Sequence, residues 1–276
     1  RHRRGAGRGG DARAPPRRGV VVIDCGSVEY AHARVHARHG QRLDAAAWRR
    51  LETVRDFTPM LELARTGALR PWLVGIGEHS DSHHIEVVLR RHWRAAVDEV
   101  ASWLPDAWQP SLRWCAWLPE LALLQHLARG GAPLAWMRDD DVWRDTCALP
   151  AAEREAWLAS GRAAALAPAW RAPDAVGALW LAAWRRLLPR TGHDVTGSLA
   201  ALVRALLAHR DAFAVAAPTQ GAALRAQLQS RLVGLLRHAA LEPAVAFVHL
   251  ALAALDLERL RAELLRRALF AQWEPA

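Results

Sequence analysis

The segment 78–84 carries the residue types from which a metal site could be built. It reads Glu-His-Ser-Asp-Ser-His-His, and the ligands of a helical metal-dependent hydrolase built on it would be His79, His83 and His84. Two glycines precede the segment and two serines interrupt it, a composition typical of a connector. We therefore predict a solvated loop in which Asp81 or Ser82 caps the following helix, and we assign no metal ligands here.

Two other clusters contain metal-ligand types. The histidines His32, His36 and His39 have a helical spacing that can chelate zinc, but they lack the glutamate of a His-Glu-x-x-His site. We predict that they form a solvent-facing or partner-facing stripe. The acidic run 139–141 could hold a cation or meet an arginine-rich partner, and we interpret it as a solvated loop tip.

The motifs of other common chemistries are missing from the sequence. The run 75–78 lacks the third glycine of a dinucleotide loop, and the absence of lysine excludes a Walker-type phosphate loop. No serine or cysteine lies in a recognisable nucleophile elbow. We therefore predict no catalytic residue, no cofactor and no metal. The fourteen tryptophans are spread along predicted helices, which favours core packing over a platform for nucleic-acid bases.

Composition predicts an all-α protein. Hydrophobic residues make up 52% of the 276 residues, and alanine, leucine and arginine dominate. Three cysteines without Cys-x-x-Cys spacing fit a reducing cytoplasm. The longest apolar run, 244–255, is too short to cross about 30 Å of hydrocarbon. The chain is therefore expected to be soluble or peripheral to a membrane.

Most of the formal net charge of +9 lies at the amino-terminal end. Residues 1–19 hold seven arginines and one aspartate, so this arm carries +6 and the body 20–276 carries +3. The arm has nothing to bury, and we predict that it is disordered. An alternative start codon among Val20, Val21 and Val22 would leave it untranslated. The small charge of the body argues against nucleic-acid binding, which stays open as an alternative function.

Helical periodicity and helix-breaking residues divide the body into segments. Helices are predicted at 29–39, 58–66, 84–104, 112–129, 151–166, 174–188, 198–215, 221–240 and 243–270, with an irregular connector at 131–150. Asp44 is expected to cap a further helix that has Trp48, Leu51 and Val54 on one face. In the first helix, Tyr30, Ala33 and Ala37 share a face that would let a neighbouring helix approach closely. Arg34 and Arg38 lie on a second face.

Three stretches resemble one family. The pattern Tyr-x-x-Ala-Arg-Val-x-Ala-Arg, formed by Tyr30, Ala33, Arg34, Val35, Ala37 and Arg38, looks like the opening helix of the adaptor subunit of V-type rotary ATPases, called C or d. The stretch 61–73, with Leu61, Thr66 and Leu73, is similar to the next segment of that family. The stretch 117–130, with Glu120, Leu121 and Arg129, resembles its repeated helix, and 194–204 and 256–267 are weaker copies. None of the three copies has the asparagine that the family prefers.

The resemblance implies a fold and a function. The fold would be three pseudo-repeated helical units that form a funnel-like body. The function would be that of a non-catalytic subunit that couples the central shaft to the membrane rotor ring for proton or sodium transport. Its partners would be rotor-ring and shaft subunits, not nucleic acid, and its location would be peripheral, at the cytoplasmic face of the inner membrane.

Overall fold

The structure, a computed structural model, describes residues 25–189 and 196–270. These residues form twelve α-helices and six short 3-10 helices, and no strand occurs among them. The prediction of an all-α protein is therefore confirmed. The arm at 1–19 lies outside the described residues.

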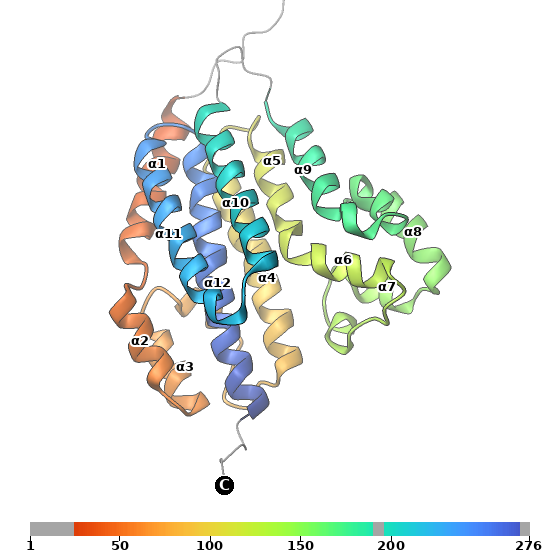
Figure 1. The fold of residues 1–276 in the computed structure, drawn as a ribbon, viewed down its shortest axis with the longest axis horizontal. Helices are drawn as coiled ribbons and strands as arrows, with labels where there is room; N and C mark the ends of the chain where they lie inside the picture. Colours follow the sequence, from red (N-terminus) through yellow and green to blue (C-terminus); the bar gives the residue numbers. More distant parts are fainter. Residues whose placement is uncertain (1–24, 190–195, 271–276) are drawn as a thin grey trace, which may run out of the picture.

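The helices follow one another with short connections (Figure 1). The α-helices of the first half are α1 (Cys25–Gln41), α2 (Ala45–Thr53), α3 (Phe57–Arg65), α4 (Ser82–Ala101), α5 (Gln109–Arg113) and α6 (Leu121–Ala128). Those of the second half are α7 (Arg144–Ala148), α8 (Ala151–Ser160), α9 (Val176–Leu187), α10 (Thr196–Val215), α11 (Gly221–His238) and α12 (Ala244–Phe270). The 3-10 helices are η1 (Arg70–Leu73), η2 (Trp114–Glu120), η3 (Ala135–Arg138), η4 (Ala164–Trp170), η5 (Pro173–Ala175) and η6 (Pro218–Gln220).

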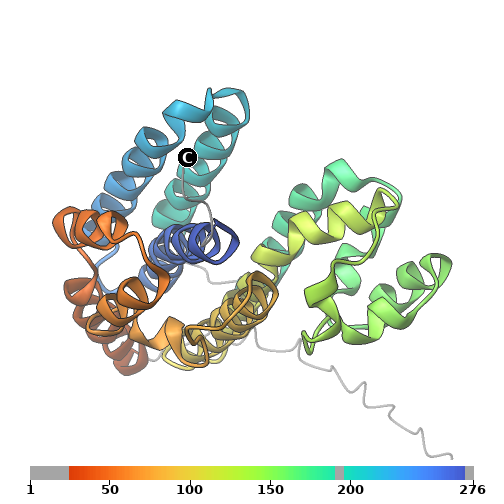
Figure 2. The ribbon, with the colours of Figure 1, turned by 90° about the horizontal axis from the view of Figure 1, so that it is seen from below.

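The helices form a bundle and a lobe, which Figure 2 separates clearly. In the bundle, α12 packs against α4, α1 and α3, and the α10–α11 hairpin packs on α12 from another side. In the lobe, α9 packs against α5, α6 and η4, and α8 also packs on η4. Helix α4 contacts α5, η2 and η3, so it connects the two parts.

The core of the bundle is centred on α12 and α4. The predicted apolar run 244–255 begins α12, and its side chains from Ala244 to Val248 are buried, as are Leu252, Leu260 and Leu264 further along. Within the described residues, no helix combines the length and the apolar character needed to span a bilayer. Tryptophans fill both parts, as predicted; the buried ones are Trp48, Trp93, Trp103, Trp108, Trp114, Trp136, Trp143 and Trp184. The apolar run is therefore the centre of a helical core.

Local capping residues start two helices as predicted. The Asp44 carboxylate accepts a hydrogen bond from the backbone N–H of Ala47 at 2.7 Å and begins α2. The Asp81 carboxylate accepts from the N–H of His84 at 2.7 Å and begins α4. Each carboxylate satisfies an N–H group that has no partner inside its helix.

The predicted helix at 112–129 is wrong as one continuous element. It is divided into α5, η2 and α6, and Pro119 lies inside η2. Proline has no N–H and its ring clashes with the preceding turn, so an α-helix does not run through it unbroken. The predicted helix at 151–166 likewise ends at Ser160, before Gly161.

The predicted packing face of the first helix is also wrong. Ala33 and Ala37 are exposed, and Tyr30 is 51% exposed. The face that α1 buries instead contains Val28, Ala31 and Val35, which are spaced three and four residues apart. This face belongs to the side on which α1 packs against α12, and burial of its two valines removes apolar area from water.

Candidate functional site

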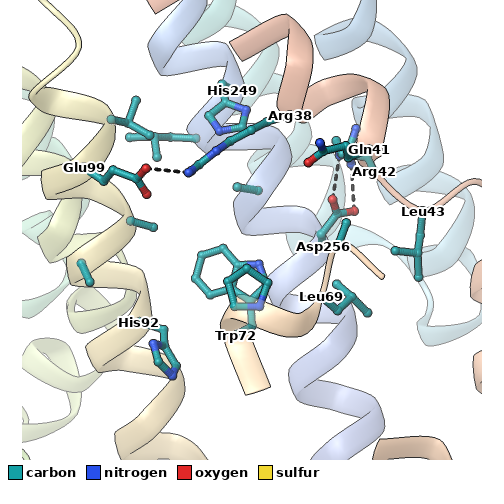
Figure 3. Close-up of a pocket in the computed structure, with 17 residues that line it drawn as sticks. Arg38, Gln41, Arg42, Leu43, Leu69, Trp72, His92, Glu99, His249 and Asp256 are labelled. Carbon is teal, nitrogen blue, oxygen red and sulfur yellow. Dashed lines mark hydrogen bonds and ion pairs between the residues drawn. The ribbon is translucent and has the colours of Figure 1, made fainter. Parts of the chain in front are cut away.

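A cleft of about 350 Å³ opens where α1, α4, α12 and η1 meet (Figure 3). Helix α1 and the residues that follow it supply basic side chains, and α12 supplies an acid and a histidine. The polar and aromatic lining includes Arg38, Arg42, Trp72, His92, His249 and Asp256. The cleft therefore contains part of the family-like pattern of the first helix, and its chemistry depends on how these charges are paired.

The Arg42–Asp256 ion pair ties the end of α1 to α12. The Arg42 Nε and Nη2 atoms donate to the two Asp256 carboxylate oxygens at 2.6 and 2.8 Å, and Nη2 also reaches the Leu252 carbonyl oxygen at 3.5 Å. The two side chains are only 11% and 14% exposed. Two parallel hydrogen bonds from one guanidinium fix both the distance and the orientation of the two helices.

A second joint, meaning a set of ion pairs between two helices, connects α1 to α4. Arg38 Nη2 donates to Glu99 Oε1 at 2.6 Å, and Arg34 Nη2 lies 3.4 Å from the same oxygen. Both guanidinium groups also lie over the Trp103 ring, with centroid distances of 4.8 Å for Arg38 and 5.0 Å for Arg34. The ion pairs are largely exposed and are weak on their own, so the stacking on tryptophan adds to the joint.

His249 brings an uncharged ring to the cleft. It is 7% exposed, and its Nδ1 atom has no hydrogen-bond partner among the described residues. Burial lowers the pKa of His249 to about 4, and the nearby positive charges of Arg38 and Arg42 act in the same direction. At neutral pH the ring is therefore neutral, and the two arginines beside it are balanced by Glu99 and Asp256.

A second charged cluster lies where α4 meets the lobe. Glu120 is 2% exposed and accepts hydrogen bonds from Arg90 at 2.6 Å, Arg94 at 3.2 Å and the Trp143 indole N–H at 2.8 Å. Arg94 also donates to Asp140 at 2.6 Å. Burial raises the pKa of Glu120, and the charge of Arg90 and the Trp143 hydrogen bond oppose that rise.

This cluster continues to α12. The Glu86 carboxylate lies 3.6 Å from the Arg90 guanidinium and also pairs with Arg261 of α12. A second cavity of about 620 Å³, walled by Trp114, Trp117 and Trp157, opens beside Glu120 and Arg94. The cluster thus connects α4, the lobe and α12, and it forms a rigid joint rather than an open set of reactive groups.

The family-like residues lie in different environments. The buried ones are Val35, Leu61, Leu73 and Glu120; the half-buried ones are Arg38 and Leu121; the exposed ones are Tyr30, Ala33, Arg34, Ala37, Thr66 and Arg129. Arg34 and Arg38 meet at Glu99, whereas Glu120 belongs to the second cluster and the exposed Arg129 pairs with Asp174. The patterns therefore belong to separate joints and do not converge on one site.

The histidines of 78–84 lie at the end of a connector and in the first turn of α4. His79 and His83 are exposed, and His84 Nε2 lies 2.8 Å from the Gly75 carbonyl oxygen. No group of three or more histidine, cysteine, aspartate or glutamate side chains suited to a metal ion occurs in the described part of the chain. The connector predicted here is confirmed for residues 78–81, and so is Asp81 as the cap of α4, whereas residues 82–84 already belong to that helix.

The other two clusters differ in outcome. The stripe His32, His36 and His39 is half-buried, so its solvent-facing form is wrong, whereas the partner-facing alternative stays a prediction; His36 Nε2 and His39 Nδ1 are buried without partners among the described residues. In the acidic run, Asp139 and Asp141 are exposed, but Asp140 is fully buried against Arg94. An unpaired carboxylate is costly to bury, so the ion pair accounts for the burial of Asp140.

No protein-family model matches this chain, and comparisons with curated proteins and with solved structures find no match. The function of this chain is therefore inferred from the ion pairs that connect its helices and from the motif pattern of its sequence.

The sequence reasoning missed four residues of the joints, which are Arg42, Arg90, Arg94 and His249. It assigned Asp140 to an acidic run and Asp256 to a weak repeat, but it did not name their partners. One signal was available for Arg90 and Arg94, which follow Glu86 at intervals of four along the predicted helix. His249 and Asp256 were visible as polar residues in and just beyond the apolar run 244–255. Polar groups at buried periodic positions need partners, but the sequence does not name those partners.

Proposed function

We propose that this chain is a non-catalytic adaptor subunit of a V-type rotary ATPase, which couples the central shaft to the membrane rotor ring during proton or sodium transport. One observation carries the proposal together with the motif pattern. Arginines and acids from the family-like stretches hold together helices that are far apart in the sequence. A subunit that transmits torque needs such cross-links, because its helices must not slide or rotate against each other under load.

The ion pairs support this mechanical role. Arg42 and Asp256 are 214 positions apart and form a mostly buried two-point contact. Glu120 accepts from two arginines of α4, 30 and 26 positions away. Truncating one member of such a pair leaves a buried charge without a partner, so each pair strongly disfavours rearranged helix packings.

The acids of the proposed repeats behave alike where they are described. Glu120 and Asp256 each pair with arginine from another segment of the chain, and Asp194, the acid of the copy at 194–204, lies outside the described residues. We infer that the bundle and the lobe are parts of a funnel of three pseudo-repeated units. The adaptor would be peripheral at the cytoplasmic face of the inner membrane, between the rotor ring and the shaft.

Affinity purification tests this proposal. The tagged full chain is isolated from gently solubilised membranes of the organism that encodes it, and its partners are identified by mass spectrometry. We expect rotor-ring and shaft subunits. A matched preparation lacks residues 1–19, which hold seven arginines, and it should recover the same subunits because the proposed contacts use the helical body.

The same two preparations test the nucleic-acid alternative. Binding through phosphate contacts weakens with salt at a log–log slope of about −0.9 per phosphate on duplex DNA. We expect the full chain to bind DNA weakly and the truncated chain to lose that binding. A truncated chain that binds nucleic acid tightly and sequence-selectively, and that recovers no ATPase subunit, would contradict the adaptor.

A further inference from the structure

The α10–α11 hairpin concentrates the positive charge of the helical body. Residues 196–238 contain one aspartate, Asp211, and five arginines, which are Arg204, Arg210, Arg225, Arg231 and Arg237. The hairpin thus carries a formal +4, which exceeds the +3 of the whole segment 20–276. The small net charge of the body is therefore unevenly distributed, and the hairpin is its most basic part.

Four of these five arginines have no acidic partner in the part of the chain that the structure describes. Arg210 pairs with its neighbour Asp211 at 2.7 Å. The other four are exposed and have no carboxylate within 4 Å among the described residues. Arginines elsewhere in the bundle, such as Arg42 and Arg94, are paired with acids from other helices. The hairpin thus leaves unbalanced positive charge on an outer side of the bundle, where α10 and α11 lie side by side (Figure 2).

The tip of the hairpin is apolar and exposed. The sequence 213–218 reads Phe-Ala-Val-Ala-Ala-Pro where α10 ends and η6 begins. Val215 is 87% exposed and Phe213 is 44% exposed. Arg225 of α11 lies over the Phe213 ring, 5.8 Å from its centroid, so a cationic group lies directly beside the apolar tip.

We propose that the hairpin tip docks on an anionic lipid bilayer. Phe213 and Val215 enter the boundary between the headgroups and the acyl chains, while Arg225 and Arg231 contact lipid phosphates. This arrangement of an apolar end flanked by arginines is how surface-bound helical segments combine burial with attraction to acidic lipids. The contact needs no protein partner, so it goes beyond the proposed adaptor role and does not depend on it.

The apolar tip favours a bilayer over nucleic acid. A duplex attracts arginines through its phosphates but offers no apolar phase for an exposed valine. Val215 and Ala214 also have no side-chain group that could hydrogen-bond to a base edge. A bilayer and a nucleic-acid duplex both present phosphates to the arginines. The experiment therefore has to separate the contribution of the apolar tip from the contribution of the positive charge.

Co-sedimentation of the full chain with vesicles tests the charge. One set of vesicles is phosphatidylcholine alone, and the other is an equal mixture with phosphatidylglycerol. We expect binding to the mixed vesicles only. The double variant Arg225→Gln/Arg231→Gln should lower the partition coefficient about 25-fold, since each arginine near an anionic surface contributes about fivefold.

The matched control is Arg55→Gln/Arg70→Gln, which removes two exposed arginines outside the hairpin. This control has the same net charge and the same arm, and we expect a change below about threefold. All replaced side chains are exposed, so thermal melts by circular dichroism should stay unchanged. Equal losses in the two double variants, or equal binding to both kinds of vesicle, would refute the hairpin site.

A second pair of variants tests the tip at constant charge. Val215→Ser should lower binding to the mixed vesicles several-fold, whereas Val74→Ser, at a valine that is 62% exposed elsewhere, should leave it unchanged. Duplex DNA should compete poorly with the vesicles. If Val215→Ser bound like Val74→Ser and duplex DNA displaced the protein from the vesicles, the hairpin would be a nucleic-acid surface and the lipid assignment would be wrong.

Discussion

Arg267 anchors the last turns of α12 to the end of α2, and its removal should destabilise the protein strongly. It is 3% exposed, and its Nε donates to the Val54 carbonyl oxygen at 3.0 Å. Its Nη2 donates to the carbonyl oxygens of Leu51 and Glu52 at 3.2 and 3.3 Å. These carbonyls lie at the end of α2, where the helix has no N–H groups left to pair with them. The fourth partner is Glu263, which accepts from Nη1 at 2.5 Å.

The expected loss for Arg267→Ala follows from these contacts. Breaking a buried charged pair costs about 3–5 kcal/mol, and a hydrogen bond to a charged group contributes about 1.5–3 kcal/mol. Water can enter part of the vacated space and Glu263 keeps Arg266 as a partner, so we expect the lower end, about 3 kcal/mol. Arg267→Lys keeps the charge but not the planar fork, and about 1–2 kcal/mol should be lost.

The neighbouring residue supplies the control. Arg266 pairs with the same Glu263 at 3.0 Å, but its side chain is 51% exposed. An exposed pair contributes about 0.2–1 kcal/mol, so Arg266→Ala should change stability little. The free energy of unfolding is measured by urea titration with far-UV circular dichroism, and equal slopes are required for the comparison. If the two alanine variants lost the same free energy, the anchoring role of Arg267 would be wrong.

The remaining predictions concern the histidines. Burial holds the folded pKa of His249 at about 4, below the unfolded value of about 6.5. The unfolded chain therefore binds the extra proton first, and up to about 3 kcal/mol of stability should be lost as pH falls from 6.5 to 4. Urea titrations at several pH values in this range should show that the unfolding free energy of His249→Leu depends less on pH than that of the unaltered protein. An equal pH dependence in the two proteins would contradict the low pKa of His249. The double variant His79→Ala/His83→Ala should change stability by less than about 0.5 kcal/mol, because both side chains are exposed. Elemental analysis that found one tightly held zinc per chain would overturn the interpretation of 78–84 as a connector.

Features that depend on a few neighbouring residues were predicted well from the sequence. Asp44 and Asp81 cap their helices because the groups they satisfy lie three residues further along the chain. The apolar run that begins α12 was recognised, although its place at the centre of the core was not part of the prediction. Pro119 was overlooked inside the predicted helix 112–129, even though its effect on the backbone is also local.

The buried faces of helices and the partners of charged side chains were predicted poorly. Helix α1 has alanine, valine and histidine around its circumference, so several faces could in principle pack against a neighbour. Contact with α12 decides that Val28, Ala31 and Val35 are buried. In the same way, Asp140 belongs to an acidic run that looks solvated, and only the position of Arg94 accounts for its complete burial.

By itself, the sequence determined the helical class, the two capped helix starts and the concentration of arginine in 196–238, since these follow from composition and from short-range geometry. The tertiary structure alone decided which charges are neutralised. Arg42 meets Asp256, and Arg267 meets the end of α2, across more than 200 residues of chain. Such pairs form only after the helices have docked, and docking depends on the total apolar area that is buried. In the described part of the chain, the same packing leaves Arg204, Arg225, Arg231 and Arg237 of the hairpin without a carboxylate partner.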